Sequence, residues 1–204
     1  MTGCLPDLKS YYRLHARFYD ATRWAFLFGR DELLRQVQER LSPRRVLEVG
    51  CGTGTNLRKL AGFYPHASLT GVDISREMLG KAEKKLSPWS DRVRLVHGKF
   101  SHAPGNPGDK DPFDLILFSY SLSMINPGWK EAIAAATSRL RAGGSLAVVD
   151  FHDSPFAGFN RWMELNHVRL GGHLLEELQR TAEKTDHRVS EAFLGIWRFF
   201  TFLS

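Results

Sequence analysis

Hydrophobic and polar positions follow two alternating rhythms along the central part of the chain. Short, nearly continuous apolar runs, typical of buried strands, occupy residues 44–50, 68–75, 92–100, 113–122 and 143–151. Apolar residues at helical spacing fill residues 55–64, 75–86 and 129–140, and Ser75 is well placed to cap the second of these helices. Strands and helices thus follow one another in turn, which predicts an α/β fold with a doubly wound, mostly parallel sheet.

The two ends of the chain add further elements to this core. Residues 10–40 contain no proline and one glycine, Gly29, and their apolar spacing predicts two helices joined near that glycine. Near the other end, a predicted helix at 173–184 precedes two strand-like runs at 187–193 and 196–203. These two runs bring the predicted sheet to seven strands.

Composition fits an ordinary globular protein, with 43% hydrophobic and 25% charged residues among 204. We divide the chain into an N-terminal helical lid and membrane-contact segment, residues 1–40, and one compact unit, residues 41–204. No run reaches the ~18 apolar residues that a spanning helix needs, and the first residues lack the features of a signal peptide, so we expect a cytoplasmic protein. Cys4 and Cys51 show no metal-ligand spacing, and we expect no metal.

The formal net charge of +6 indicates an anionic partner, either nucleic acid or a membrane surface. Part of the positive charge lies near the start of the chain, where basic residues alternate with aromatic ones. The basic residues there are Lys9, Arg13, Arg17, Arg23 and Arg30, and the aromatic ones are Tyr11, Tyr12, Phe18, Tyr19, Trp24, Phe26 and Phe28.

A glycine-rich turn follows the first predicted strand. Gly50, Gly52 and Gly54 form the pattern G-x-G-x-G, whereas the dinucleotide fingerprint needs its third glycine where Thr55 stands. Such a turn lets backbone N–H groups approach an anionic ligand at the start of a helix. Glu48, two residues before the first glycine, is placed to pair with an amino group. The turn therefore fits an amino-acid moiety better than a pyrophosphate.

An acid, Asp73, ends the second predicted strand, where a carboxylate can accept both hydroxyls of a ribose. The pattern E-x-G-x-G-x-G followed by this acid resembles the class I S-adenosylmethionine-dependent methyltransferases over residues 45–151. The resemblance implies a Rossmann-like seven-stranded fold and S-adenosylmethionine as cofactor, with the glycines on its methionine part. The cofactor residues expected on this basis are Glu48, Gly50, Cys51, Gly52, Gly54, Asn56, Asp73, Ile74, Met78, Phe100 and Ser119.

Two places test how far this resemblance extends. Many family members carry an acid after the third strand that binds adenine, but residues 98–100 here read Gly-Lys-Phe, so we expect Phe100 to stack on the adenine instead. Residues 126–129, Asn-Pro-Gly-Trp, look like the motif of nucleic-acid methyltransferases, yet they lie several residues beyond the fourth strand. We interpret them as a turn that opens the next helix, and we expect no nucleic-acid substrate.

Three stretches, residues 11–30, 118–125 and 148–151, resemble the bacterial diacylglyceryl-homoserine N-methyltransferases, which make a trimethylated betaine lipid. Families that methylate phosphatidylethanolamine or ornithine lipids share the architecture and stay open as alternatives. The resemblance implies a lipid amine as substrate and an anionic membrane surface as partner, with the protein held peripherally at the inner face of the membrane.

Candidate substrate residues come from both ends of the chain. Tyr12, His15 and Tyr19 share one face of the first predicted helix, where they could close over the cofactor as a lid. Aromatic faces attract a trimethylammonium group, which makes Tyr12, Tyr19 and Tyr120 candidates for a cage, although packing explains each tyrosine equally well. Arg23 and Arg30 are candidates for the homoserine carboxylate or for pairs with Asp20 and Asp31, and Asp150 and His152 for proton acceptors at the carboxyl edge of the sheet.

The opposite face of the N-terminal helices resembles an interfacial membrane helix, and residues 156–162 are a candidate second contact. The alternative is a buried amphipathic helix. Three other functions stay open: a soluble small-molecule methyltransferase, a module that senses the cofactor without chemistry, and, least favoured, a nicotinamide-dependent oxidoreductase.

Overall fold

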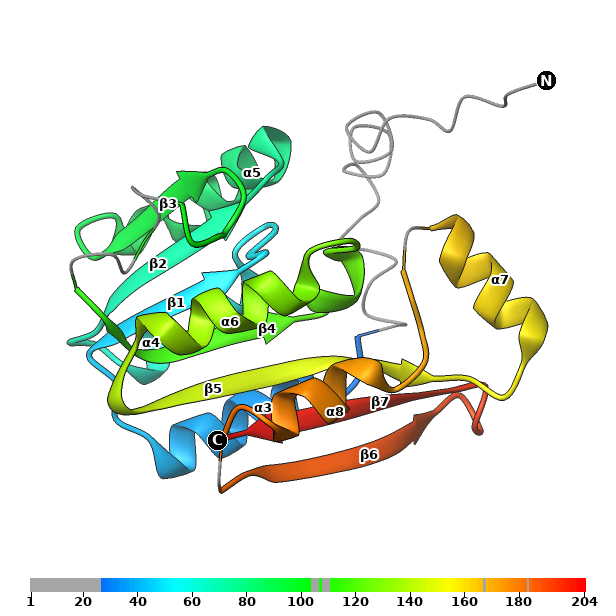
Figure 1. The fold of residues 1–204 in the computed structure, drawn as a ribbon. Helices are drawn as coiled ribbons and strands as arrows, with labels where there is room; N and C mark the ends of the chain where they lie inside the picture. Colours follow the sequence, from blue (N-terminus) through cyan, green and yellow to red (C-terminus); the bar gives the residue numbers. More distant parts are fainter. Residues whose placement is uncertain (1–26, 104–106, 108–110, 167, 183) are drawn as a thin grey trace.

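The computed structural model describes residues 27–103, 107, 111–166, 168–182 and 184–204. Its centre is a seven-stranded sheet in the order β3-β2-β1-β4-β5-β7-β6 (Figure 1). The strands are β1 Arg45–Val49, β2 Ser68–Asp73, β3 Val93–His97, β4 Phe113–Ser119, β5 Leu140–Asp153, β6 Asp186–Ala192 and β7 Trp197–Leu203. β7 runs antiparallel to both β5 and β6, while the pairs from β3 to β5 are parallel. The predicted doubly wound, mostly parallel sheet of seven strands is confirmed.

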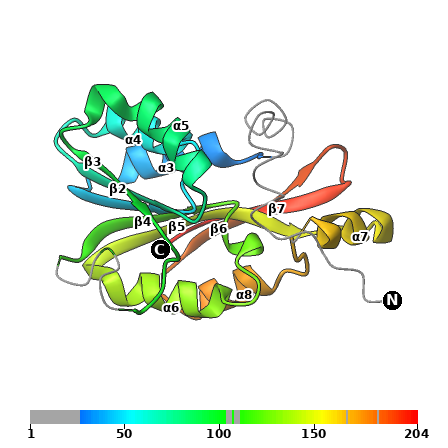
Figure 2. The same cartoon turned by 90° about the horizontal axis from the view of Figure 1, so that it is seen from above.

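Helices cover both faces of the sheet (Figure 2). The helices α3 Arg30–Arg40, α4 Thr55–Phe63 and α5 Arg76–Leu86 lie on one face, and α6 Trp129–Arg139 and α8 His173–Gln179 lie on the other. The remaining helix, α7 Ala157–Leu165, follows the end of β5. Each face buries its own apolar cluster, and all seven residues of β4 are buried between the two layers. This burial explains why β4 is an almost continuous apolar run in the sequence.

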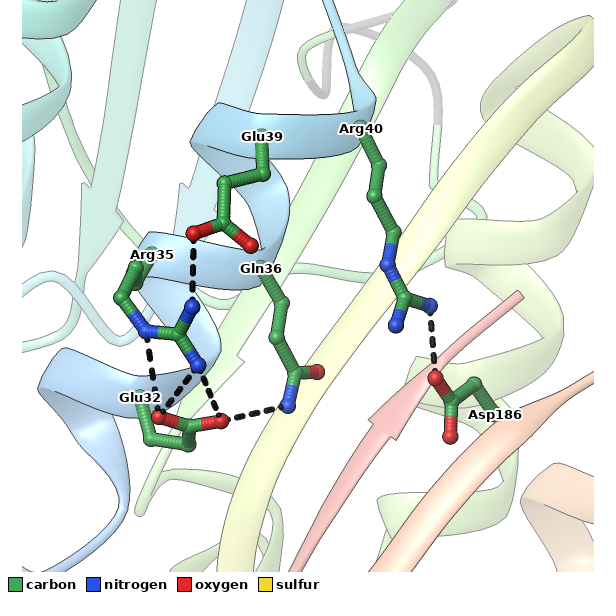
Figure 3. Close-up of polar contacts among 6 residues, drawn as sticks. All are labelled: Glu32, Arg35, Gln36, Glu39, Arg40 and Asp186. Carbon is green, nitrogen blue, oxygen red and sulfur yellow. Dashed lines mark hydrogen bonds and ion pairs between the residues drawn. The ribbon is translucent and has the colours of Figure 1, made fainter.

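α3 packs onto the sheet through Leu33, Leu34 and Val37, all buried. Its outer surface carries ion pairs among Glu32, Arg35 and Glu39, and at its end Arg40 pairs with Asp186 at the start of β6, with 2.6 Å between Nη1 and Oδ2 (Figure 3). The predicted break near Gly29 is present, because Gly29 has φ 76° and precedes the helix. The first of the two predicted N-terminal helices lies outside the described residues.

Local signals of the sequence are recovered at two helix starts. The hydroxyl of Ser75 accepts a hydrogen bond from the Met78 amide, 3.2 Å away, as expected of an N-cap. Residues 126–129 form a turn that leads into α6, with Gly128 as the residue before the helix. The interpretation of Asn-Pro-Gly-Trp as a turn is thus confirmed.

Three elements differ from the prediction. β5 is longer than residues 143–151, because it pairs with β4 on one side and β7 on the other and its register shifts near Phe113. α8 ends at Gln179 rather than at residue 184, where the Thr181 hydroxyl donates to the Leu178 carbonyl and competes with the helical pattern. The sequence did not predict α7, since its apolar positions lie in an aromatic stretch without clear boundaries.

No described helix is long and apolar enough to cross a membrane. Within the described ranges there is also no group of three histidine, cysteine, aspartate or glutamate side chains placed to hold a metal ion.

Candidate functional site

The glycine-rich turn lies at the carboxyl ends of β1 and β2. Gly50, Gly52 and Gly54 all have positive φ angles, 73°, 53° and 73°. The amides of Gly50 and Cys51 donate to the Val72 carbonyl at 2.8 and 3.1 Å, which fastens the turn to β2. Non-glycine residues adopt this backbone region only with strain, so the glycines are required by the shape of the turn.

Gly50 is required by space as well as by conformation. A Cβ at this position would lie 2.5 Å from the Cβ of Ser121 at the end of β4. The Ser121 hydroxyl donates to the Val49 carbonyl at 2.8 Å and thereby ties the ends of β1 and β4 together. Between these two strands the direction of the chain connections reverses, the place where open α/β sheets bind ligands.

Asp73 connects the glycine turn to the start of α5. One carboxylate oxygen accepts from the Gly52 amide at 2.7 Å, and the other accepts from the Ser75 amide at 2.9 Å. The acid predicted to bind the ribose is therefore positioned at the edge of the turn by two backbone bonds. Binding of a ribose by this carboxylate stays a prediction.

A cavity of about 230 Å³ opens beside the turn at the ends of β1 and β4. It is lined by Leu27, Arg30, Glu48, Gly50, Cys51, Thr53, Thr55, Asn56, Lys85 and Ser119. Glu48 Oε1 accepts from Asn56 Nδ2 at 2.7 Å, while Glu48 Oε2 and Ser119 Oγ are buried and have no hydrogen-bond partner among the described residues. Buried polar atoms need hydrogen-bond partners, and a polar ligand in the cavity could provide one for both of these atoms.

Burial raises the pKa of Glu48 to about 8, and Asp73 adds to the rise, while the Asn56 hydrogen bond and Arg30 oppose it. An ammonium group beside Oε2 would favour the ionised carboxylate and reverse this shift. Burial also raises the pKa of the Cys51 thiol well above its ordinary value, so Cys51 is a protonated wall residue and not a nucleophile.

Leu27, Thr53, Thr55 and Lys85 line the cavity but were not among the residues expected from the sequence. Lys85 Nζ donates to the hydroxyls of Thr53 and Thr55 at 3.0 and 2.9 Å and so ties α5 to the glycine turn. Thr53 lies within the glycine motif and Thr55 directly follows it, so their place in the sequence already indicates both as candidates. No local signal separates Lys85 from its neighbouring lysines or indicates Leu27.

Three of the expected cofactor residues, Ile74, Met78 and Phe100, have different surroundings; the resemblance places the first two on the faces of the adenine. Ile74 is exposed beside the end of β2, as a residue facing a ligand would be, whereas Met78 is fully buried in α5. Phe100 packs in the apolar cluster of the opposite sheet face, with the Arg139 guanidinium 5.3 Å from its ring centre. The structure thus gives Ile74 the most open face of the three, and an adenine contact of Phe100 stays a prediction.

Tyr120 lies next to the cavity rather than in its wall. Its side chain is 1% exposed, its hydroxyl donates to the Phe28 carbonyl at 2.7 Å, and its ring meets that of Phe151 at 4.7 Å. Its φ of 54° is unusual for a tyrosine. In this arrangement Tyr120 anchors the segment before α3 and presents no open aromatic face to a ligand, unlike the expected cage residue.

Asp150 and His152 are also away from the cavity, on the sheet face covered by α6 and α8. Asp150 is fully buried and accepts hydrogen bonds from the amides of Ser123 and Phe151, at 3.1 and 2.8 Å. Burial raises its pKa to about 6. The His152 ring packs against Gly172 and Phe200, and burial lowers its pKa. Alternate residues of a strand point to opposite faces, so neither side chain lines this cavity. The expected role of Asp150 and His152 as proton acceptors stays a prediction.

Four expected residues, Tyr12, His15, Tyr19 and Arg23, lie outside the described residues. Arg30, the last expected substrate residue, begins α3 and lines the cavity. The structure therefore brings together Arg30, Glu48 and Ser119 with the glycine turn.

Comparison with known proteins agrees with this geometry. Residues 46–144 match the family model described as a methyltransferase domain. The chain is 35% identical to trans-aconitate 2-methyltransferase of Streptomyces avermitilis, over 61% of this chain and 46% of that protein. It is 28% identical to malonyl-[acyl-carrier protein] O-methyltransferase of Priestia megaterium, over 73% and 53% of the two chains. The chain spans about half the length of the curated relatives it matches.

Solved structures share the fold. The N-methyltransferase NodS of Bradyrhizobium japonicum, in complex with S-adenosylhomocysteine, matches with a TM-score of 0.73 and 21% identity, over 96% of this chain and 97% of that one. The phosphoethanolamine N-methyltransferase 2 of Haemonchus contortus matches with a TM-score of 0.73 and 14% identity, over 93% and 58%. At these identities the likeness establishes the fold alone.

Proposed function

Because the chain carries a methyltransferase domain in the class I, Rossmann-like fold, we propose that it is an S-adenosylmethionine-dependent N-methyltransferase. Its acceptor is the amine of a lipid head group, diacylglyceryl-homoserine first, with ethanolamine and ornithine lipids as alternatives. It works at the anionic inner surface of the cell membrane and has no nucleic-acid substrate.

The observation that carries methyl transfer is the cavity with Glu48, Ser119 and the glycine turn on its wall. Glu48 Oε2 and Ser119 Oγ are unpaired acceptor atoms among the described residues, and both fit the ammonium group of the cofactor's methionine part. The positive-φ glycines carry no side chains that would cover the turn, so the carboxylate of the methionine part can approach the backbone there. The cofactor supplies an electrophilic methyl group on a sulfonium.

The amine acceptor rests on other observations. The N-terminal stretch resembles lipid N-methyltransferases, and two structural neighbours are themselves named N-methyltransferases. Arg30 brings a cation to the cavity wall, where the carboxylate of a homoserine head group could bind it. In methyl transfer by in-line displacement the protein's contribution is to align the acceptor and exclude water.

A second candidate is methylation of a soluble carboxylic acid. The curated relatives named above act on trans-aconitate and on a malonyl group carried by a protein, and both names describe acidic acceptors. Arg30 could bind such an acid as readily as a homoserine carboxylate. The two candidates differ in proton chemistry, since a carboxylate is ready to react at neutral pH and an ammonium group is not.

The test is mass spectrometry after incubation with labelled S-adenosylmethionine. Mixed vesicles containing homoserine, ornithine and ethanolamine head groups are offered in one reaction, and trans-aconitate with a malonyl thioester in another. Stepwise gains on the homoserine lipid support the proposal, and its Glu48→Gln variant should lose most of the signal. Transfer only to the acids would replace the lipid by a soluble acceptor, and no transfer with cofactor binding intact would overturn both.

The dependence of the rate on pH separates the two acceptors independently. With an amine acceptor, the rate at low acceptor concentration should rise about tenfold per pH unit while the amine remains mostly protonated. With a carboxylate acceptor the rate should not show this rise between pH 6 and 8. The measurement is kcat/KM for each acceptor that is methylated, at saturating cofactor.

A further inference from the structure

Exposed apolar side chains gather at one end of the sheet. Of the nine large apolar side chains that are exposed among the described residues, seven come from three neighbouring segments. Phe193, Leu194 and Ile196 form the turn between β6 and β7, Phe156, Trp162 and Leu165 belong to α7 and the residue before it, and Phe28 precedes α3. We call these seven residues the apolar rim. Leu194 is completely exposed and Leu165 is 70% exposed.

Contacts join the three segments of the apolar rim. Figure 2 shows the β6–β7 turn and α7 at the same end of the molecule. The Ser154 hydroxyl, just before α7, donates to the Ile196 carbonyl at 2.5 Å. The Phe159 ring of α7 stacks on Trp197 at 5.2 Å, and Phe28 meets Phe193 edge-on at 5.4 Å. The turn, the helix and the segment before α3 therefore support one another.

The β6–β7 turn contradicts ordinary turn chemistry. Phe193 and Leu194 have φ angles of 48° and 56°, and the Gly195 amide donates to the Ala192 carbonyl at 3.2 Å. Positive φ at both central residues is the hairpin arrangement that strongly favours Asn-Gly or Gly-Gly. Two bulky apolar residues in solvent, held in a strained backbone, are a mark of a functional surface rather than of a stabilising turn.

The apolar rim adjoins the cavity. Leu27 and Arg30 line the cavity, and Phe28 between them belongs to the rim. The Tyr120 hydroxyl holds the Phe28 carbonyl, which fixes this connection at the end of β4. A surface bound to the rim would thus lie beside the opening where the acceptor must enter.

Charges around the rim are balanced. Arg198 and Asp153 pair with each other, and α7 carries one charge of each sign, Arg161 and Glu164, three positions apart. Exposed Glu191 adds a negative charge at the end of β6. Among the described residues around the rim there is therefore no excess of positive charge to attract anionic lipid, and the chemistry of the rim fits insertion of apolar side chains instead.

We propose that the apolar rim inserts into the boundary between head groups and acyl chains of a lipid bilayer, and so seats the cavity on the membrane. This inference rests on the proposed function, because a lipid acceptor has to be reached at a bilayer. It differs from the predicted contact of the basic N-terminal segment, since the rim binds an uncharged surface and its binding does not depend on salt.

The test is flotation of the full chain with phosphatidylcholine vesicles, which carry no net charge. The variants are Leu194→Asn, Leu165→Gln and the double variant, and the matched control is Val189→Thr, which alters an exposed apolar residue of β6 outside the rim. Each rim substitution should lower the vesicle partition coefficient roughly tenfold, and the double variant about a hundredfold, while the control leaves it unchanged. High salt should have little effect.

Thermal melting separates binding from folding. Asparagine adopts positive φ more easily than leucine, so Leu194→Asn should raise Tm by about 2–4 °C while it weakens vesicle binding. Unchanged partition of the folded double variant, or a loss matched by Val189→Thr, would overturn the inference. A concentration-dependent dimer that dissociates in the double variant, without vesicle binding by either protein, would assign the rim to a second copy instead.

Methyl transfer distinguishes failure of this inference from failure of the proposed function. A short-chain homoserine lipid below its aggregation limit needs no membrane, so the double variant should methylate it at the rate of the unaltered protein. Loss of transfer to vesicle lipid, with this activity kept, supports the rim. Absence of transfer to either acceptor by the unaltered protein concerns the proposed function alone, and vesicle binding still decides the role of the rim.

Discussion

The glycine turn and the β6–β7 turn both contain residues with positive φ, but glycines occupy these positions in the first turn and large apolar residues occupy two of them in the second. Gly50, Gly52 and Gly54 take φ angles between 53° and 73°, while Phe193 and Leu194 take 48° and 56°. Glycine adopts this backbone region without strain and places no side chain over the turn, which leaves room for a ligand to approach the backbone. Large side chains keep the strain and present apolar surface. The same backbone region therefore leaves open space beside the chain when glycine occupies it and displays apolar surface when large residues do.

The largest expected effect comes from replacing one glycine by alanine in each turn, which tests whether the two turns differ in their tolerance of a side chain. Gly50→Ala adds a Cβ 2.5 Å from Ser121 at positive φ, whereas Gly195→Ala at φ 87° meets nothing closer than 3.5 Å. Overlap and strain together should lower the free energy of unfolding by about 3 kcal/mol at Gly50 and by about 1 kcal/mol at Gly195. Chemical denaturation of both variants measures the difference.

The affinity for the cofactor should also differ between the two glycine variants. Gly50→Ala should abolish detectable binding of S-adenosylmethionine in calorimetry, and Gly195→Ala should leave the affinity unchanged. Equal losses of stability in the two variants would mean that the glycine turn relaxes around the added methyl group. The claim that the glycine turn has no room for a side chain at Gly50 would then be wrong.

Glu48→Gln tests the charge beside the glycine turn. Removal of a charge-assisted hydrogen bond to the cofactor's ammonium group should lower its affinity about 10- to 100-fold. In the unaltered protein the affinity should also rise between pH 6 and 7.5, because the pKa of Glu48 is raised to about 8 and binding requires its carboxylate. The variant should not show this rise. Titration calorimetry at several pH values provides the measurement, and Asp150→Asn, away from the cavity, is the control.

Glu48→Gln should also raise the free energy of unfolding of the cofactor-free protein, by an amount that depends on pH. Glu48 ionises near 4.5 when unfolded and near 8 when folded, so the folded state holds the extra proton between these values. The stability that Glu48 contributes is present below pH 4.5 and is lost as pH rises to 8, by at most about 1.4 kcal/mol per pH unit. The excess stability of Glu48→Gln over the unaltered protein should therefore grow from pH 5 to pH 8. A constant difference would contradict the buried, proton-bearing carboxylate.

Sequence reasoning succeeded where structure is decided locally. Strand and helix rhythms, the Ser75 cap and the glycine turn each depend on residues within a few positions of one another, and all three appear in the structure. The sequence also predicts that Glu48, Gly50 and Ser119 lie close together, since they stand at the carboxyl ends of β1 and β4, and all three line the cavity. Their contact with a cofactor stays a prediction.

The rest depends on contacts between distant segments. The bond from Lys85 to the threonines of the turn joins residues about 30 positions apart, and the Tyr120 contact with Phe28 joins residues 92 positions apart. No local pattern indicates either one. The sequence also does not indicate which face of β5 carries Asp150, because the side chains of a strand alternate between two faces and the covering helices decide what each face meets. The sequence predicts only part of the apolar rim, residues 156–162, because no residue type in the β6–β7 turn indicates its strained backbone.

The smallest expected effect is a pair of Tm changes, one for a residue that suits its backbone position and one for a residue that does not. Beside the glycine turn the Ser75 hydroxyl already accepts from the Met78 amide, so Ser75→Ala should lower the free energy of unfolding by about 1 kcal/mol and Tm by about 2–4 °C. In the β6–β7 turn, Leu194→Asn should shift Tm by a similar amount in the opposite direction. Calorimetry of the two variants and of their combination tests this, and the combination should return Tm close to the starting value because the sites are far apart in sequence and share no contact among those described. Two losses of Tm would mean that the strained turn is stabilising after all, and the contrast between the two turns would then lie in ligand binding only.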